Sequence, residues 1–206
     1  MPLGGSITQG VGSSERNGYR QYLYEALLLG GFKVRMVGSR RMGSFENNSH
    51  EGWRGFRIDE IEKKARQSVK RFLPNVITVN AGSNDCLQDF DIEHIGERMG
   101  NMLEYLWQVS PRSTVVLSTL LVNLDKEVDS RVIRVNEQFR VLARQKAADQ
   151  KRITLADMYV PGGPQIGDLV DGTHPSEEGY QKMTKIWYNA IQEAARNGLL
   201  QEPEST

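Results

Sequence analysis

Apolar runs with the character of β-strands recur along the chain. They are rich in Val, Ile and Thr, which suit a pleated surface. They cover residues 32–38, 75–82, 113–122 and 152–158. The first three residues, "MPL", read as the remnant of a fifth strand. The pattern therefore predicts a sheet of about five strands.

Between these runs, apolar residues recur every three or four positions, which is typical of amphipathic helices. This spacing predicts helices over 19–29, 58–69, 92–109 and 128–147. A last helix is expected to begin after Ser176, a good N-cap residue, and to end near residues 197–198. Because strands and helices alternate, we predict an α/β fold with a parallel sheet covered by helices on both faces.

The 206 residues suffice for one α/β domain. We place this domain at residues 1–200 and expect residues 201–206 to be a frayed tail. Lys and Arg together number 26, as do Asp and Glu, so the formal net charge is zero. This balance gives no reason to expect a nucleic-acid or membrane partner. The basic run at 63–71 is interpreted as a solvated helix face, with phosphate binding as the less favoured alternative.

Cys86 is the only cysteine, so the chain can form neither an internal disulfide nor a thiolate zinc site. No apolar stretch reaches the length of a membrane helix, and no signal peptide is visible. The chain starts inside the predicted first strand, so we expect further sequence upstream of Met1.

In parallel sheets, sites form where strands end in loops at their carboxyl edge. Ser6 follows the first predicted strand, and as a nucleophile it would need a base such as neutral imidazole. Of the three histidines, His174 has a built-in orienting carboxylate, because Asp171 precedes it by three residues on a tight loop. His94 falls in a helical pattern, whereas His50 lies in a polar loop where it could line a site.

Ester hydrolysis also needs hydrogen-bond donors for the developing oxyanion. The side-chain amide of Asn84 follows the strand at 75–82, and the backbone N–H of Gly55 lies at a helix start. The N–H of Ser6 is a third candidate. Each of these residues has an ordinary structural role as an alternative; the catalytic hypothesis rests on their occurrence together at successive strand ends.

Four segments resemble the four blocks of the SGNH hydrolases in the GDSL esterase/lipase superfamily. They are "GGSIT" with Ser6, "GWRGFRIDEI" with Gly55, "GSNDC" with Asn84, and "DGTHPS" with Asp171 and His174. The second block is the loosest, and Gly52 is a possible substitute for Gly55. Longer stretches, such as "MPLGGSITQG" and "NAGSNDCLQDFDI", resemble carbohydrate esterase family 3.

This resemblance implies a single three-layer α/β/α domain of flavodoxin-like SGNH-hydrolase fold. It implies a catalytic Ser6, Asp171 and His174, with an oxyanion hole from Ser6, Gly55 and Asn84. The implied activity is removal of acetyl groups from acetylated carbohydrate, with acetyl xylan as the expected polymer. No cofactor is implied; some relatives carry a structural calcium, for which no ligands can be assigned. We expect a monomer and, by resemblance, secretion; a cytoplasmic location is the alternative.

One departure is that Gly5 stands where the family motif has Asp. Loss of that bracing carboxylate keeps alternatives open. One is a thioesterase, lysophospholipase or other esterase of the same superfamily, and another is a weakly active or inactive carbohydrate-binding descendant. Trp53 and His50 are proposed as substrate-binding residues, with plain packing an equal alternative for Trp53. We assign no metal ligand.

Overall fold

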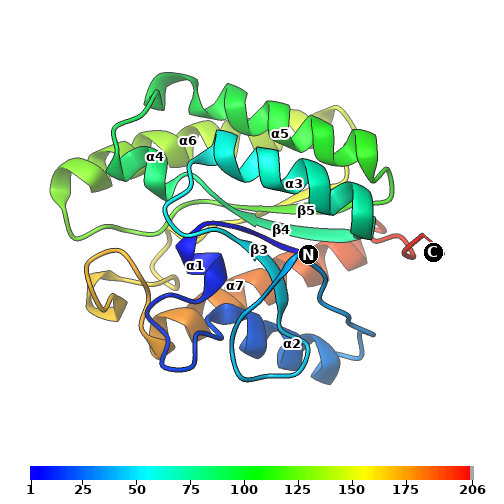
Figure 1. Ribbon diagram of the computed structural model, residues 1–206. Helices are drawn as coiled ribbons and strands as arrows, with labels where there is room; N and C mark the ends of the chain where they lie inside the picture. The colour runs from blue at the N-terminus through cyan, green and yellow to red at the C-terminus, as the bar shows by residue number, and fades with distance from the viewer. Residues whose placement is uncertain (205–206) are drawn as a thin grey trace.

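The computed structural model describes residues 1–204, and a six-stranded sheet runs through its centre (Figure 1). The strands are β1 (Pro2–Gly4), β2 (Arg40–Arg41), β3 (Ser49–Gly52), β4 (Val76–Asn80), β5 (Thr114–Ser118) and β6 (Ile153–Ala156). Their order in the sheet is β2-β3-β1-β4-β5-β6. All neighbours pair in parallel except the two-residue β2, which runs antiparallel to β3.

Helices cover both faces of the sheet, as predicted. The helices are α1 (Ser6–Gln9), α2 (Tyr19–Leu29), α3 (Ile58–Phe72), α4 (Ser83–Leu87), α5 (Ile95–Val109), α6 (Lys126–Ala148) and α7 (Glu177–Arg196). Two short 3-10 helices, η1 (Ile92–His94) and η2 (Ile166–Asp168), complete them. Figure 1 shows α3, α5 and α6 on one side of the sheet, and α2 and α7 on the other. The predicted three-layer α/β/α fold is therefore confirmed. The sheet has six strands where about five were predicted, because β2 and β3 were not predicted and one predicted strand does not form.

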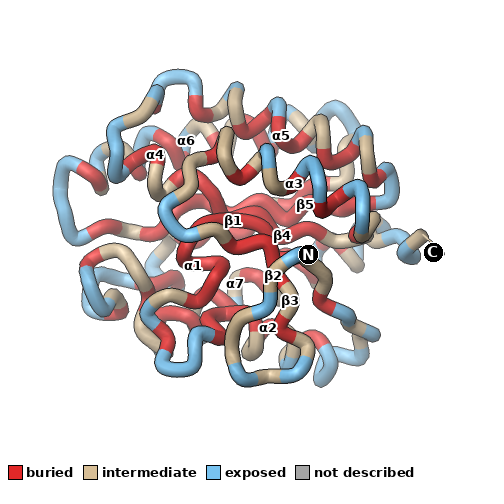
Figure 2. The backbone as a smooth tube through the Cα atoms, in the orientation of Figure 1, coloured by how far each residue is buried: buried red, intermediate tan, exposed pale blue. Residues whose placement is uncertain are grey.

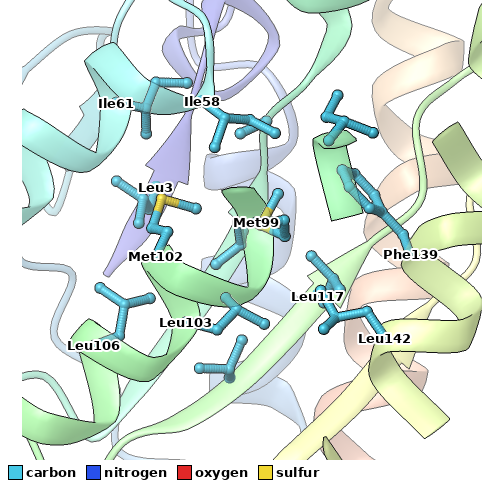
Figure 3. Packing of buried hydrophobic residues seen from close by; sticks show 14 of the residues in the cluster. Leu3, Ile58, Ile61, Met99, Met102, Leu103, Leu106, Leu117, Phe139 and Leu142 are labelled. Carbon is cyan, nitrogen blue, oxygen red and sulfur yellow. The ribbon is translucent and has the colours of Figure 1, made fainter. Parts of the chain in front are cut away.

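Buried residues follow the central strands and recur along the helices that flank them (Figure 2). The apolar side chains among them form two clusters that hold the layers together. In the larger cluster, Leu3 of β1 contacts residues of α3 and α5, among them Ile61 and Met102 (Figure 3). The smaller cluster packs α2 and α7 against the other face through Tyr19 and Trp187, whose rings are 5.6 Å apart. Full burial of one aliphatic side chain in these clusters contributes about 1.5–3 kcal/mol to the stability of the fold, so the sheet is firmly fixed between its helices.

The prediction of a strand at 32–38 is wrong. This segment is neither helix nor strand and lies outside the sheet. The N–H of Met36 donates to the Asn47 side-chain oxygen at 2.9 Å instead of to a neighbouring strand. The strand that pairs with β1 on the side opposite β4 is β3, whose sequence "SHEG" has no apolar character. Its His50 and Glu51 are nevertheless fully buried.

The last helix begins after Ser176, as predicted, because the Ser176 hydroxyl accepts the N–H of Gly179 at 3.2 Å. The expected frayed tail is described only as far as residue 204. In that part, the backbone oxygen of Gln201 accepts a hydrogen bond from Asn75 at 2.6 Å. Residues 205–206 lie outside the described part of the chain. No helix in residues 1–204 combines the length and apolar character needed to cross a bilayer.

Candidate active site

Ser6 begins α1 directly beyond the end of β1. The two preceding glycines have different roles. At Gly4, a Cβ atom would come within 2.1 Å of the Asn80 backbone oxygen, so only glycine allows β1 and β4 to approach this closely. At Gly5, a Cβ atom would meet nothing closer than the Asn84 amide nitrogen at 3.5 Å. Ser6 is thus held at the carboxyl edge of the sheet by backbone packing.

A chain of hydrogen-bonded groups links Ser6 to the loop before α7. His174 Nε2 lies 2.8 Å from Ser6 Oγ, and His174 Nδ1 lies 2.7 Å from Asp171 Oδ2. The other Asp171 oxygen accepts the backbone N–H groups of Thr173 and His174, at 3.1 and 2.8 Å. Gly172 takes φ +84° between them, a conformation that favours glycine. The loop therefore orients both the imidazole ring and its carboxylate.

The electrostatics of Asp171 suit a permanently charged carboxylate. Burial alone would raise the pKa of Asp171, but hydrogen bonds from the His174 backbone and ring hold this pKa below its ordinary value. Asp171 therefore remains ionised at neutral pH and can accept the hydrogen bond that orients the His174 ring.

Asn123 and Leu124, in the segment that follows β5, support the loop of Asp171 and His174. The sequence analysis did not identify either residue. The Leu124 N–H donates to the Gly172 oxygen at 2.9 Å, and the Asn123 amide donates to Thr173 Oγ1 at 3.0 Å. Asn123 is itself fixed, because its backbone N–H donates to Asp129 Oδ1 at 2.8 Å. Asn123 lies beyond the carboxyl end of a predicted strand, a position that could have identified it.

The predicted oxyanion donors converge on the same edge. Gly55 has φ +82° in a turn closed by the bond from the Phe56 N–H to the Trp53 oxygen, 3.3 Å. The Asn84 amide nitrogen donates to the Phe56 oxygen at 3.0 Å, which leaves its second hydrogen available. Within residues 1–204, the backbone N–H groups of Ser6 and Gly55 donate to no acceptor.

A buried ion pair ties these two donor segments together. Asp85, which follows Asn84, is fully buried and accepts the N–H of Ile58 at 3.1 Å. Its other oxygen accepts from Arg98 at 2.8 Å. Because Ile58 is the first residue of α3, Asp85 fixes the start of α3, and with it the Gly55 turn, relative to Asn84.

Ser6 and Asn84 line one small cavity together with Gly5 and Phe56. The space open to the centre of a water molecule is about 10 Å³. That is roughly the space needed for one water-sized group. A group beside Ser6 in this cavity must therefore be small.

His50 does not contribute to the surface of the site. Its side chain has no exposed area, and its Nδ1 accepts the Gly52 N–H at 2.8 Å. Burial lowers the pKa of His50 to about 3, assisted by the charges of Arg20 and Arg40, so the ring stays neutral. The prediction that His50 binds substrate is wrong for this structure, because a substrate cannot contact a fully buried ring.

Trp53 lies next to the Gly55 turn, but other side chains already pack on its indole. Phe56 is stacked on it at 5.5 Å, and Arg40 and Lys64 each lie 4.5 Å from the ring centroid. Its Nε1 donates to Glu51 at 3.0 Å. Stacking of a sugar on Trp53 would require these groups to move; its predicted role in substrate binding remains untested.

In the part of the chain that the structure describes, no group of three or more His, Cys, Asp or Glu residues could hold a metal ion. His94 pairs with Asp91 at 2.6 Å on an exposed turn. The structural calcium that the resemblance raised stays without assigned ligands.

A three-layer α/β fold with a serine and a histidine–aspartate loop at one sheet edge defines the SGNH type of hydrolase. The chain belongs to the GDSL-like Lipase/Acylhydrolase family, whose pattern matches residues 3–182. It is an esterase-type hydrolase by this membership.

Similar proteins of known identity agree with this class. The chain is 27% identical over 221 residues to a multidomain esterase of Ruminococcus flavefaciens, covering 93% of this chain but only 28% of that protein. It superimposes on the family 3 carbohydrate esterase of Clostridium thermocellum with a TM-score of 0.85 and 25% identity, over 97% of each chain. A family 3 carbohydrate esterase of Talaromyces cellulolyticus matches with a TM-score of 0.82 and 20% identity, over 96% and 97% of the two chains.

Proposed function

We propose that this chain is a serine esterase that removes acetyl groups from acetylated carbohydrate, with acetyl xylan as its substrate. The observation that carries the proposal is the continuous contact from Ser6 Oγ through His174 to Asp171, at 2.8 and 2.7 Å. These distances are short enough for direct proton transfer between the nucleophile and its base.

In the proposed mechanism, Ser6 Oγ attacks the acetyl carbonyl carbon while His174 Nε2 takes its proton. The tetrahedral intermediate collapses, the sugar oxygen leaves, and His174 returns the proton to it. Water then attacks the acetyl-enzyme with His174 again as base, and releases acetate and free Ser6. Asp171 holds the imidazole in the required tautomer and stabilises the imidazolium.

Three donors would stabilise the oxyanion: the N–H groups of Ser6 and Gly55 and the side-chain amide of Asn84. Fixed donors of this kind lower the barrier because they need no reorganisation when negative charge develops. The turn at Gly55 and the Asp85–Arg98 pair keep two of them in place.

Two features favour a small acyl group on a sugar. The cavity beside Ser6 has room for one small group, which suits an acetyl methyl better than a fatty chain. The loops around the site, 38–54 and 159–170, are rich in polar residues and glycine. The likeness to family 3 carbohydrate esterases supports the same substrate class.

All proposed steps use side chains and water, so the reaction requires no cofactor. By the same resemblance, we propose that the protein acts outside the cell and as a monomer. Its relative in Ruminococcus flavefaciens is much longer than this chain, so activity on a whole polymer is a proposal for this domain alone.

The test is acetate release from acetylated xylan, nitrophenyl acetate and nitrophenyl octanoate, each with wild type and Ser6→Ala. We expect Ser6-dependent release from xylan and nitrophenyl acetate, but not from octanoate. Preferred octanoate hydrolysis would instead support a thioesterase or lysophospholipase. Binding of acetylated xylan without any hydrolysis would support an inactive, carbohydrate-binding descendant.

A further inference from the structure

Cationic side chains gather around Trp53 at the rim of the candidate active site. The Arg40 guanidinium and the Lys64 ammonium each lie 4.5 Å from the indole ring centroid. Arg54 follows Trp53 in the chain and is exposed. We call Arg40, Arg54 and Lys64 the Trp53 basic cluster; the Arg57 guanidinium lies outside it, 4.0 Å from the centroid of the Phe90 ring.

Most of this charge is not neutralised by the protein. Among residues 1–204, neither Arg40, Arg54 nor Lys64 forms an ion pair, whereas Arg57 lies 3.5 Å from Glu60. The Glu51 carboxylate is close to the indole, but it is buried and accepts from Trp53 Nε1 and Ser68 Oγ. The three cations of the cluster therefore outnumber the one buried carboxylate beside the indole, in a chain whose total net charge is zero.

The cluster lies against the segment that carries Ser6. The Trp53 N–H donates to the Gly4 oxygen at 2.9 Å. The Trp53 oxygen would lie 3.9 Å from a Cβ atom at Gly5, the residue before Ser6. Arg54 directly precedes Gly55. Phe56, which is stacked on the Trp53 indole at 5.5 Å, lines the same small cavity as Ser6. The cluster therefore borders the segments that carry Ser6 and Gly55.

We propose that the Trp53 basic cluster binds a carboxylate of the substrate, carried by a uronic acid close to the acetylated sugar. The inference rests on the proposed function and makes it more specific, because it assigns the enzyme to acidic acetylated polysaccharides. Guanidinium and ammonium groups without a protein counter-ion are well suited to a sugar carboxylate. Cations already seated on the indole also explain why Trp53 need not stack on a sugar itself.

The probe is a pair of acetylated xylo-oligosaccharides, one carrying a glucuronic acid side group and one from which a glucuronidase has removed it. Acetate release gives kcat/KM for each in wild type, Lys64→Gln and Arg54→Gln. Lys70→Gln is the matched control, because Lys70 lies on the same helix α3 and is exposed near its far end. All assays are run at low and high salt.

We expect wild type to prefer the uronate-bearing substrate. Each cluster variant should lower the ratio of the two kcat/KM values by about two- to fivefold, mainly through KM, as for a partly exposed ion pair. Lys70→Gln should keep the wild-type ratio, and high salt should lower it in wild type. A merely structural role for Lys64 or Arg54 would lower both kcat/KM values equally and leave their ratio unchanged.

Equal kcat/KM values for both oligosaccharides in wild type would overturn the inference and leave the proposed function standing. An unchanged ratio in both cluster variants would do the same. Acetate release from neither substrate would overturn the proposed function, and the inference with it.

Discussion

At the scale of single residues, Gly4 and Gly5 show that two adjacent glycines can differ in how much room they leave for a side chain. Gly4 lies where β1 and β4 nearly touch, and a Cβ atom would fall 2.1 Å from the Asn80 oxygen. Gly5 replaces the aspartate of the family motif, yet its surroundings leave ordinary contact distances for a side chain. The missing carboxylate is thus a chemical difference and not the result of crowding.

This contrast predicts different outcomes for the two alanine variants. Gly4→Ala should lower the free energy of unfolding by at least about 2 kcal/mol, because the strands must separate. Gly5→Ala should change it by less than about 1 kcal/mol, because its Cβ meets no atom closer than 3.5 Å. Urea unfolding measures both. Equal losses in the two variants would contradict the packing described for β1.

Asn84 is the side-chain donor of the proposed oxyanion hole. Asn84→Ala should lower kcat by about 100- to 1000-fold, the usual loss for one such donor. Steady-state kinetics with nitrophenyl acetate measures this loss, and the urea midpoint controls for the lost bond to the Phe56 oxygen. A loss below about threefold would remove Asn84 from the site.

At the scale of helices and strands, apolar periodicity predicted the elements whose buried apolar side chains form the core. The helix at 19–29 was predicted with its observed bounds, because its buried face packs on α7. By contrast, β3 is held by polar contacts: Glu51 accepts the Ser68 hydroxyl at 2.6 Å, and His50 accepts the Gly52 N–H. The partner of Glu51 lies 17 residues further along the chain, so no local hydrophobic pattern predicts this contact.

The ion pair between Asp157, just after β6, and Arg140 of α6 predicts a pH-dependent contribution to the free energy of unfolding. Asp157, just after β6, accepts from Arg140 of α6 at 2.8 Å and from Thr119 at 2.9 Å. Burial alone would raise the pKa of Asp157, but these donors hold it below its ordinary value. A lowered pKa in the folded state stabilises the protein above the unfolded pKa of about 3.9, and this stabilisation is lost as the pH falls.

Asp157→Asn should therefore lower the free energy of unfolding by about 1 kcal/mol at pH 7 and by progressively less as the pH falls below about 3.9. Chemical denaturation across this pH range measures the difference. Asp149→Asn, at an exposed position after α6, is the control and should show no comparable loss at pH 7. A difference for Asp157→Asn that is constant with pH would contradict the assigned ion pair.

At the scale of the whole molecule, Cys86 reports on global unfolding. It lies within α4 and is fully buried in the larger apolar cluster. Burial raises its pKa to about 12, with a further contribution from the Asp85 charge, so the thiol stays protonated at pH 8. Its reaction with a thiol reagent at pH 8 should follow the urea unfolding curve, and fast labelling of the native protein would contradict this burial.

The site is predictable from sequence to the extent that it lies at strand ends. Ser6, Asn84 and the Asp171–His174 loop each follow an apolar run or precede a capped helix, and the fold brings them to one edge. The supporting residue Asn123 and the cations around Trp53 were not predicted. Their roles depend on how separate loops meet in space, and neither hydrophobic pattern nor spacing contains that information.

The central claim is that Ser6 is a nucleophile activated by His174. The most direct test is reaction with a fluorophosphonate, followed by mass spectrometry of the intact protein and its peptides. The account predicts one adduct, located on Ser6, that is absent in Ser6→Ala and forms far more slowly in His174→Ala. An adduct on another residue, or equal labelling of Ser6 without His174, would contradict it.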